Sequence, residues 1–431
     1  MLNIKFNIKK IVLFLLSIII FSSLFLFVFV LFFKDNNIYV KNQSKRIKSK
    51  KEINIIATLG KNGYDKIEEF CKSGANIFRI NGSHIKSEKI MKDTLDGVME
   101  NMKKCKNGEV MYDTQGPEIR VLIPSEKQDI EAGYEVRNGD IIFIHTNLQD
   151  KEVMFVDDKE QDKNKKIHFG VNYKEFVNDI KEGGYLTIEN RSVIGKIENI
   201  NKEKGIVKVV VSEVNTGDGK YKITDRRHIN LFGENVSLDT LTENDKKYIK
   251  MSVKSGIKYL AISFVRNEKD IEDVRQIIRD VFKEQNSKLN DNELTKMAND
   301  IKIIAKFETL QGLQNIEKIM KVADGSMIAR GDLSSEIPME EVPYAKDLII
   351  KVSNKNHKMC ILATDVLESL MRQEIPSKND IDVIASSLQQ GVDVIMLSNE
   401  TAQSKNADKA ISVLVQHFNL YNKKIENGNV F

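Results

Sequence analysis

The feature that most constrains this sequence is a repeated alternation of short apolar runs with longer amphipathic segments, which begins at Ile53. Short runs rich in Ile, Val and Phe are typical of buried parallel strands, and the amphipathic segments between them are typical of helices. The eight predicted strands are Asn54–Leu59, Asn76–Ile80, Val110–Thr114, Tyr259–Phe264, Lys302–Glu308, Ser326–Asp332, Cys360–Thr364 and Val394–Ser398. Eight such units predict an α/β fold, a closed (β/α)8 barrel of the TIM type.

The alternation is interrupted once, between Val121 and about Lys222. Strand-like segments such as Ile141–His145 and Val207–Val211 are separated here by turn-forming clusters, a pattern typical of a β domain. Because the interruption follows the third predicted strand, the inserted domain should stand over the carboxyl-terminal mouth of the barrel as a lid. We therefore predict a barrel formed by residues 52–120 and 223–431 and a small inserted β-barrel lid formed by residues 121–222.

The first 51 residues are predicted to be a hydrophobic anchor or targeting segment with a basic linker. The run Ile11–Phe33 carries no charge over 23 residues, enough for a helix to cross a bilayer and attach the chain to a membrane. More basic residues follow this run than precede it, so the positive-inside rule would leave the body of an anchored protein facing the cytosol. The same segment also resembles a two-part organelle address of the plastid type, and both localisations stay open.

The composition excludes several classes of protein. The chain has 66 basic and 62 acidic side chains, a formal charge of +4, and 41% hydrophobic residues. This balance is typical of a globular protein and excludes a polytopic membrane protein and a uniformly basic nucleic-acid binder. The three cysteines, Cys71, Cys105 and Cys360, are widely spaced and odd in number, so we expect reduced structural thiols.

Charged residues gather where the fifth and sixth predicted strands end. Lys306 and Glu308 are two residues apart, so their side chains should point to the same side of the strand. One unit later, the sixth strand ends with Arg330, Gly331 and Asp332, which places a second carboxylate beside the first. Two carboxylates with room for phosphate oxygens predict a Mg²⁺ site, and a salt-bridged layer of the barrel is the equally weighted alternative.

Further polar residues end the second and third predicted strands. Arg79 and Arg120 can hold phosphate groups through charge-assisted hydrogen bonds. The sequence contains no GxxxxGK[ST] loop, so a nucleotide cannot bind in the P-loop manner. Oxygen atoms for a further cation are offered by Asn81, Ser83, Asp113 and Thr114.

Seven motifs at the strand ends and loops resemble those of one enzyme family. They are Arg79-Ile-Asn-Gly-Ser-His84, Asp113-Thr-Gln-Gly-Pro-Glu-Ile-Arg120, Ser263-Phe-Val-Arg266, Lys306-Phe-Glu308, Ala329-Arg-Gly-Asp-Leu333, Ala363-Thr-Asp-Val-Leu-Glu-Ser369 and Ser398-Asn-Glu-Thr-Ala402. With these motifs, the sequence resembles the pyruvate kinase family from about Ile53 to Phe431. The resemblance implies a mobile β domain that closes over a barrel, and transfer of a phosphoryl group from phosphoenolpyruvate to ADP, giving pyruvate and ATP in the last step of glycolysis.

The resemblance also implies cofactors and roles for individual residues. Lys306, Arg79 and Thr364 would be catalytic, and the substrate would also contact Gly331 and Asp332. Mg²⁺, or Mn²⁺ in its place, would bind Glu308 and Asp332. K⁺ would bind Asn81, Ser83, Asp113 and Thr114. ADP or ATP would contact Arg120, Arg227, Ser398 and Glu400.

The resemblance further implies that Glu118 goes with dependence on K⁺, and we expect a homo-oligomer. The chain ends soon after the eighth predicted helix, so the carboxyl-terminal regulatory domain typical of the family is expected to be missing, together with control by a sugar phosphate bound there.

The sequence departs from the family pattern at positions around the expected site. Gly82 replaces a phenylalanine, Ser334 a glycine, Asp365 a glutamine, His228 a glycine and Phe232 a proline, and Glu189-Asn190 stands where an Asp-Asp-Gly turn is common. Two alternatives to a pyruvate kinase stay open. Because of these departures, one is a non-catalytic homologue that acts as a binding or interaction module. The other is another Mg²⁺-dependent enzyme of phosphoenolpyruvate or pyruvate, because a pair of metal-binding carboxylates alone does not specify phosphoryl transfer.

Overall fold

The computed structural model of the chain describes residues 52–61, 63–123, 133–146, 166–234 and 236–427. The hydrophobic run Ile11–Phe33 and the basic linker after it lie outside these residues. Within the described ranges, every helix is too short or too polar to cross a membrane.

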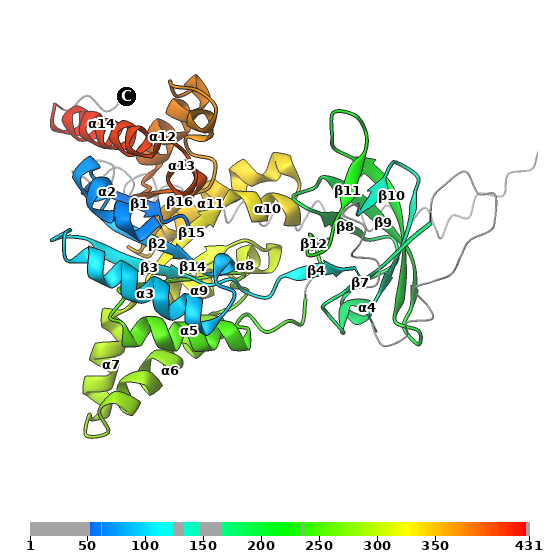
Figure 1. The fold of residues 1–431 in the computed structure, drawn as a ribbon, viewed down its shortest axis with the longest axis horizontal. Coiled ribbons are helices and arrows are strands. Elements are labelled where there is room, and N and C mark those ends of the chain that lie inside the picture. The colour runs from blue at the N-terminus through cyan, green and yellow to red at the C-terminus, as the bar shows by residue number, and fades with distance from the viewer. Residues whose placement is uncertain (1–51, 62, 124–132, 147–165, 235, 428–431) are drawn as a thin grey trace, which may run out of the picture.

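Eight parallel strands close into one barrel, which we call the parallel barrel (Figure 1). Its strands follow one another around the barrel in the order β1-β17-β16-β15-β14-β13-β3-β2, as the sequence predicted. Their bounds are β1 (Asn54–Thr58), β2 (Ile77–Asn81), β3 (Glu109–Asp113), β13 (Tyr259–Ile262), β14 (Lys302–Phe307), β15 (Gly325–Ala329), β16 (Met359–Ala363) and β17 (Val394–Leu397). The sixth strand is shorter than predicted, because a helix takes over the chain at Arg330.

Amphipathic helices surround the parallel barrel and turn their apolar faces to the strands. The longer ones are α3 (Glu88–Met102), α5 (Glu243–Lys254), α6 (Glu268–Gln285), α7 (Asp291–Asp300), α11 (Val342–Lys355), α12 (Lys378–Gln390) and α14 (Ala407–Glu426). The shorter ones are α2 (Ile67–Ser73), α8 (Leu310–Gln314), α9 (Ile316–Val322), α10 (Arg330–Glu336) and α13 (Asn399–Ala402). Capping boxes fix the first turns of α5, α6, α7 and α12, which sets where these helices begin.

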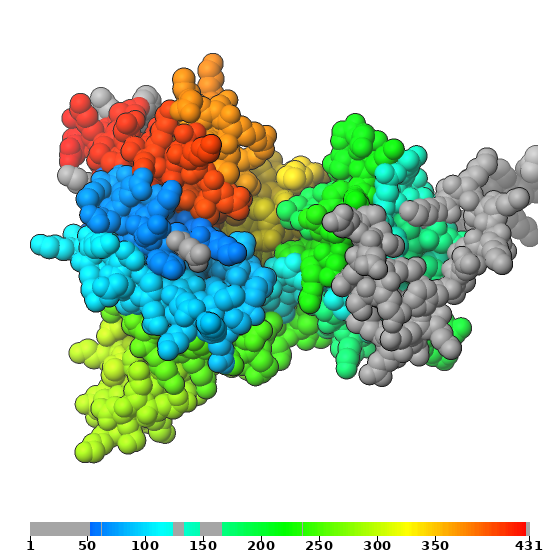
Figure 2. Space-filling model, viewed as in Figure 1, coloured from blue at the N-terminus to red at the C-terminus, as the bar shows by residue number. Residues whose placement is uncertain are grey.

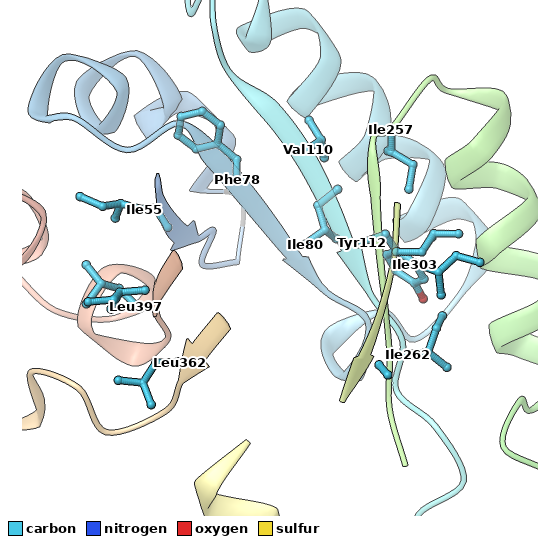
Figure 3. Close-up of a cluster of buried hydrophobic side chains, with 14 of the residues drawn as sticks. Ile55, Phe78, Ile80, Val110, Tyr112, Ile257, Ile262, Ile303, Leu362 and Leu397 are labelled. Atoms are coloured by element: carbon cyan, nitrogen blue, oxygen red, sulfur yellow. The ribbon is translucent and has the colours of Figure 1, made fainter. Parts of the chain in front are cut away.

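The main core lies between the strands and the helices. Phe78, Tyr112, Ile303 and Leu397 are fully buried there, and Figure 3 shows how side chains from several strands contribute to this layer. Burial of this apolar surface is the main force that holds helices against strands. The charged residues of the predicted site are thereby left at the ends of the strands.

A second closed barrel, which we call the inserted barrel, follows β3 and forms the smaller lobe in Figure 2. Its strands are β4 (Ile119–Leu122), β6 (Ile141–His145), β7 (Lys166–Val171), β8 (Tyr185–Ile188), β9 (Val193–Asn201), β10 (Ile206–Val214) and β12 (His228–Phe232). The short helix α4 (Phe176–Asp179) and the pair β5 (Tyr134–Val136) and β11 (Tyr221–Ile223) complete it. Its strands run from Ile119 to Phe232, a wider span than residues 121–222.

The expectation of three reduced cysteines was wrong for two of them. Cys71 and Cys105 form a disulfide, with their Cα atoms 6.0 Å apart. Cys71 lies near the end of α2 and Cys105 lies just after α3, and these two helices pack side by side on the outside of the parallel barrel. A separation of 34 residues hides this proximity in the sequence. Cys360 is a buried thiol in β16.

Candidate active site

A buried lysine is the centre of the charged cluster at the mouth of the parallel barrel. Lys306, near the end of β14, is 8% exposed. Its Nζ atom lies 3.0 Å from Asp113 Oδ1 and 2.9 Å from Glu308 Oε1, and it donates a hydrogen bond of 2.7 Å to Ser263 Oγ. These partners come from the ends of β3, β13 and β14, which are neighbours in the barrel. The cluster therefore depends on strand order and not on any single loop.

The charges of this cluster shift one another's titration. Burial alone lowers the pKa of Lys306, but Asp113 and Glu308 outweigh it and raise this pKa above its usual range, so the side chain is a cation. Burial raises the pKa of Glu308 to about 8, and the neighbouring Asp332 adds to this increase while Lys306 opposes it. Carboxylates crowded in a buried place favour a bound cation, which would relieve their repulsion.

Arg79 is fixed beside this cluster by two hydrogen bonds. Its Nε atom donates to Asp113 Oδ2 at 2.7 Å, and Nη1 donates to Thr58 Oγ1 at 3.1 Å. Asp113 is fully buried and thus links Arg79 with Lys306. Burial raises the pKa of Asp113, but Lys306 and Arg79 lower it by more, so this carboxyl is ionised. Two cations held around one carboxylate form a rigid site for an anion.

The residues expected to hold a monovalent cation lie on β2 and β3 and in the turns after them. Asn81 is the register partner of Asp113, and its Oδ1 atom accepts a hydrogen bond of 3.2 Å from the Ser83 backbone N–H. Thr114 contacts Ser263 twice, because its Oγ1 accepts from the Ser263 N–H at 3.0 Å and its carbonyl accepts from Ser263 Oγ at 2.6 Å. Ser263 therefore connects this group of oxygens to Lys306.

Gly82 explains one departure from the family pattern. A Cβ atom at this position would lie 2.6 Å from the Asp113 carbonyl oxygen and 2.8 Å from the Tyr112 hydroxyl. The close approach of β3 to this turn therefore requires glycine, and a phenylalanine would need a different path of the chain.

Gly331 and Asp332 lie in the first turn of α10 and not at the end of a strand as predicted. The Gly331 N–H donates to Thr364 Oγ1 at 3.3 Å, which brings this threonine to the same place. Thr364 and Asp365 have left-handed backbone angles, with φ of 60° and 53°. Arg330 holds this strained pair by donating to the carbonyl oxygens of both residues. Ser334 has no positive φ, so its replacement of a glycine adds no backbone strain.

The four expected nucleotide residues fall into two separate groups. Arg120 and Arg227 belong to the inserted barrel. Arg120 forms an ion pair with Glu118, and Arg227 Nη1 lies 3.0 Å from Glu189 Oε1. Ser398 and Glu400 follow β17, and the Ser398 N–H donates to Glu400 Oε2 at 2.7 Å. Within the described parts of the chain, no hydrogen bond or ion pair joins the two groups.

Sequence reasoning missed two acids that connect the two barrels, the buried Asp245 and the half-buried Glu336. Asp245, in the capping box of α5, accepts from the backbone N–H groups of Gln115 and Gly116, where the chain leaves for the inserted barrel. Glu336, at the end of α10, is hydrogen-bonded to Asn230 of β12, and burial raises its pKa to about 8. A Thr-x-x-Asp pattern signals the cap at Asp245, but no sequence signal reveals what else these acids contact.

The donor set fits a divalent cation that keeps water or substrate oxygens in its shell. Among the described residues, no group of three or more His, Cys, Asp and Glu side chains could hold a metal alone. Glu308 and Asp332 supply two carboxylates near Lys306, and Mg²⁺ usually binds to proteins through one or two carboxylates together with substrate phosphate.

Comparisons with known proteins agree with this arrangement. Residues 50–411 match the family model described as pyruvate kinase, barrel domain. Pyruvate kinase from Thermotoga maritima is 32% identical over 378 residues, which are 86% of this chain and 71% of that protein. Plastidial pyruvate kinase 3 from Arabidopsis thaliana is 30% identical over 372 residues, 85% of this chain and 57% of that protein.

A solved structure and the length of the curated relatives add two further comparisons. A crystal structure of a pyruvate kinase from Cryptosporidium parvum superposes with a TM-score of 0.72 at 25% identity, covering 87% of this chain and 70% of that one. Pyruvate kinase from Staphylococcus epidermidis is 31% identical over 84% of this chain, but the match covers 55% of its own length. The chain thus spans about half the length of several curated relatives that it matches.

Proposed function

The chain belongs to the pyruvate kinase family, and from this premise we propose that it transfers the phosphoryl group of phosphoenolpyruvate to ADP, giving pyruvate and ATP. The observation that carries this proposal is the buried cationic Lys306, held by Asp113, Glu308 and Ser263 at the mouth of the barrel. Phosphoryl transfer needs mainly positioning and compensation of charge, and a rigid buried cation supplies both.

Lys306 and Arg79 act on the phosphoryl group in this proposal. Both side chains are held by Asp113, so they present positive charge from fixed positions at the time of transfer. Because the positions are set before the substrate arrives, little reorganisation is needed during the reaction.

The proposed metal ligands fall into two groups, one for a divalent and one for a monovalent cation. Glu308 and Asp332 would hold Mg²⁺ or Mn²⁺, and Asn81, Ser83, Asp113 and Thr114 would hold K⁺. When bound, the divalent ion supplies Lewis-acid neutralisation of phosphate oxygens. Glu308 is also fixed by the Phe264 N–H, which donates to its Oε2 atom at 2.7 Å.

The remaining residues bind and orient. The backbone N–H groups of Gly331 and Asp332 would receive the substrate carboxylate, and Thr364 would guide a proton to the enolate carbon through water. Arg120 and Arg227 would bring the nucleotide phosphates from the inserted barrel, so the lid would have to approach the site. Ser398 and Glu400 would meet the nucleotide from the parallel barrel, where Glu400 orients the Ser398 backbone.

The test is pyruvate formation by the full chain in detergent, with phosphoenolpyruvate, ADP, Mg²⁺ and K⁺. We expect turnover in the parent and its loss, by about a thousandfold or more, in Lys306→Met and Glu308→Gln. A folded parent that binds phosphoenolpyruvate and Mg²⁺ without turnover would instead support the non-catalytic homologue. Enolate chemistry that needs Mg²⁺ but no ADP would support the other phosphoenolpyruvate or pyruvate enzyme.

We also propose that the chain works in an organelle and not facing the cytosol. The Cys71–Cys105 disulfide supports this choice, because disulfides persist in oxidising compartments and are rare in the cytosol. A reporter fused after Lys51 would be cleaved inside an organelle, and alkylation of cysteines in intact cells would leave Cys71 and Cys105 unmodified. A reporter retained uncleaved at a membrane facing the cytosol would contradict the proposal.

We propose a homo-oligomer as well. Met339 and Tyr344, which flank the start of α11, are 57% and 76% exposed, and exposed large apolar side chains are candidates for an interface. Light scattering of the full chain, with Tyr344→Glu as the variant, measures whether this face joins two copies.

A further inference from the structure

Among the described residues of the inserted barrel, the turn between β8 and β9 has the longest run of left-handed residues other than glycine. Glu189, Asn190 and Arg191 have φ angles of 48°, 49° and 64°, so three consecutive residues other than glycine adopt the left-handed region. The Asp-Asp-Gly turn common in the family would place glycine at the third of these positions. Such strain persists only where the surrounding contacts compensate for it.

Arg191 makes contacts of this kind, and they reach the other barrel. Its Nη1 atom donates to the carbonyl oxygens of Ser334 and Ile337, at 3.1 and 3.2 Å. Its guanidinium carbon lies 5.5 Å from the centre of the Phe232 ring, a cation–π distance. Asn215 holds the turn itself, because its side chain donates to the Arg191 carbonyl at 2.9 Å.

The contacted segment is α10, which carries the substrate-side residues. Figure 1 shows α10 between the two barrels, facing β8 and β12. Arg191 is hydrogen-bonded to the carboxyl-terminal end of this helix, and Gly331 and Asp332 lie in its first turn. The Ser334 hydroxyl joins the two ends, since it donates to the Gly331 carbonyl at 2.6 Å. A second contact, from Asn230 to Glu336 at 3.5 Å, follows the same path.

We propose that Arg191 is a positioning residue that latches the inserted barrel to α10 and so ties the position of the lid to that of Asp332. The inference rests on the proposed function for the role of Asp332, but the latch itself is a property of the fold. Phe232, whose ring lies beside the Arg191 guanidinium, is a position where this sequence departs from the family pattern. These two departures fit together, because an arginine at a glycine position gains an aromatic ring there, in addition to the backbone carbonyl oxygens of Ser334 and Ile337.

The latch is tested with Arg191→Gly, which removes the contacts and also relieves the left-handed strain, so the variant should fold. Arg191→Lys keeps the charge but cannot reach both carbonyl oxygens and stack on the ring with one planar group. Arg137→Gly is the matched control, since Arg137 is an exposed arginine of the inserted barrel paired with Glu135. All measurements use the full chain in detergent.

Hydrogen exchange of the backbone N–H groups in residues 333–337 is the first readout, and it needs no turnover. We expect exchange in Arg191→Gly to be about tenfold faster than in the parent, with a smaller increase in Arg191→Lys and none in Arg137→Gly. Unchanged exchange of α10 in Arg191→Gly would overturn the latch. Faster exchange in a chain without kinase turnover would support the latch and contradict only the proposed function.

Kinetic constants are the second readout. Displacement of Asp332 should raise the KM for phosphoenolpyruvate about tenfold in Arg191→Gly, with a smaller change in kcat, because positioning and not the reacting groups is lost. A Phe232→Leu variant should give a change in the same direction, and the two substitutions together should be less than additive. A loss of kcat in Arg191→Gly without any change of the KM for phosphoenolpyruvate would contradict the positioning role.

Discussion

The two barrels place their charged residues in opposite ways. The parallel barrel buries Lys306, Arg79 and Asp113 at the ends of its strands, where they contact one another directly. The interior of the inserted barrel is mainly apolar, apart from residues such as the buried His145, and charged pairs such as Lys208 and Glu198 lie near its surface. The buried cluster is fixed by the strands that carry it, whereas pairs exposed to water can exchange partners at little cost in free energy. A rigid site in the parallel barrel thus follows from where this barrel holds its charge.

The two connections between the barrels are both held from the side of the parallel barrel. The outgoing connection is held by Asp245, and the returning one is held by Arg266, whose guanidinium donates to the carbonyl oxygens of Val236 and Leu238. Both anchors belong to the parallel barrel and are buried. The joint is therefore firm on the barrel side, and we expect motion to arise beyond it, between Gly116 and the first strand of the inserted barrel.

The largest effect is expected where a buried charge loses its partner. Asp113→Asn keeps the shape of the side chain but leaves Arg79 and Lys306 buried without their shared counter-charge. We expect the free energy of unfolding of the parallel barrel to fall by about 4 kcal/mol. Chemical unfolding followed by hydrogen exchange measures each barrel separately. Equal destabilisation of the inserted barrel would contradict the contrast between the two.

The disulfide should stabilise only the parallel barrel. Cys71→Ser opens a loop of 34 residues and is expected to lower the free energy of unfolding by about 3 kcal/mol under oxidising conditions. The parent in a reducing buffer is the control and should approach the variant. A difference between parent and variant that survives complete reduction would show that packing around Cys71, and not the covalent bond, is responsible.

The junction between the barrels should respond to acid through Glu118. Burial alone would raise the pKa of this carboxyl, but hydrogen bonds from His228 and Gln115 and the charge of Arg120 lower it to about 2. Because the pKa of Glu118 is lower in the folded state than its unfolded value of about 4.3, the ionised carboxyl stabilises the protein at pH values above about 4.3. This contribution is lost as the pH falls toward 2. His228→Ala should make the loss of stability in this range smaller, by about 1.5 kcal/mol in total.

Unfolding measured at several pH values between 5 and 2 tests this expectation. In a Glu118→Gln background, His228→Ala should leave the pH dependence unchanged, because the titrating group is gone. If His228→Ala in the parent leaves the dependence of the free energy of unfolding on pH unchanged, the assignment of this dependence to Glu118 and His228 is contradicted.

The sequence predicted the parallel barrel and its charged cluster but not what connects distant segments. All eight strands could be predicted because a buried parallel strand must be an apolar run, and Lys306 and Glu308 stood out as charges at the end of one. The end of the sixth strand at Ala329 could not be predicted, because Ala-Arg-Gly-Asp gives no signal for where the strand stops and the helix begins. The proximity of Cys71 to Cys105, and the reach of Arg191 to α10, depend on packing between elements far apart in the chain.

The smallest effect is expected at the surface of the inserted barrel and completes the comparison with Asp113. Lys208 pairs with Glu198 across β10 and β9 at 2.9 Å, with side chains 36% and 42% exposed. Because water screens such a pair and both side chains lose freedom by forming it, Lys208→Met should change the free energy of unfolding by less than about 0.5 kcal/mol. The same unfolding measurement, at low and high salt, checks this. A loss as large as that of Asp113→Asn would mean that the inserted barrel, too, depends on fixed charges, and the contrast between the two barrels would not hold.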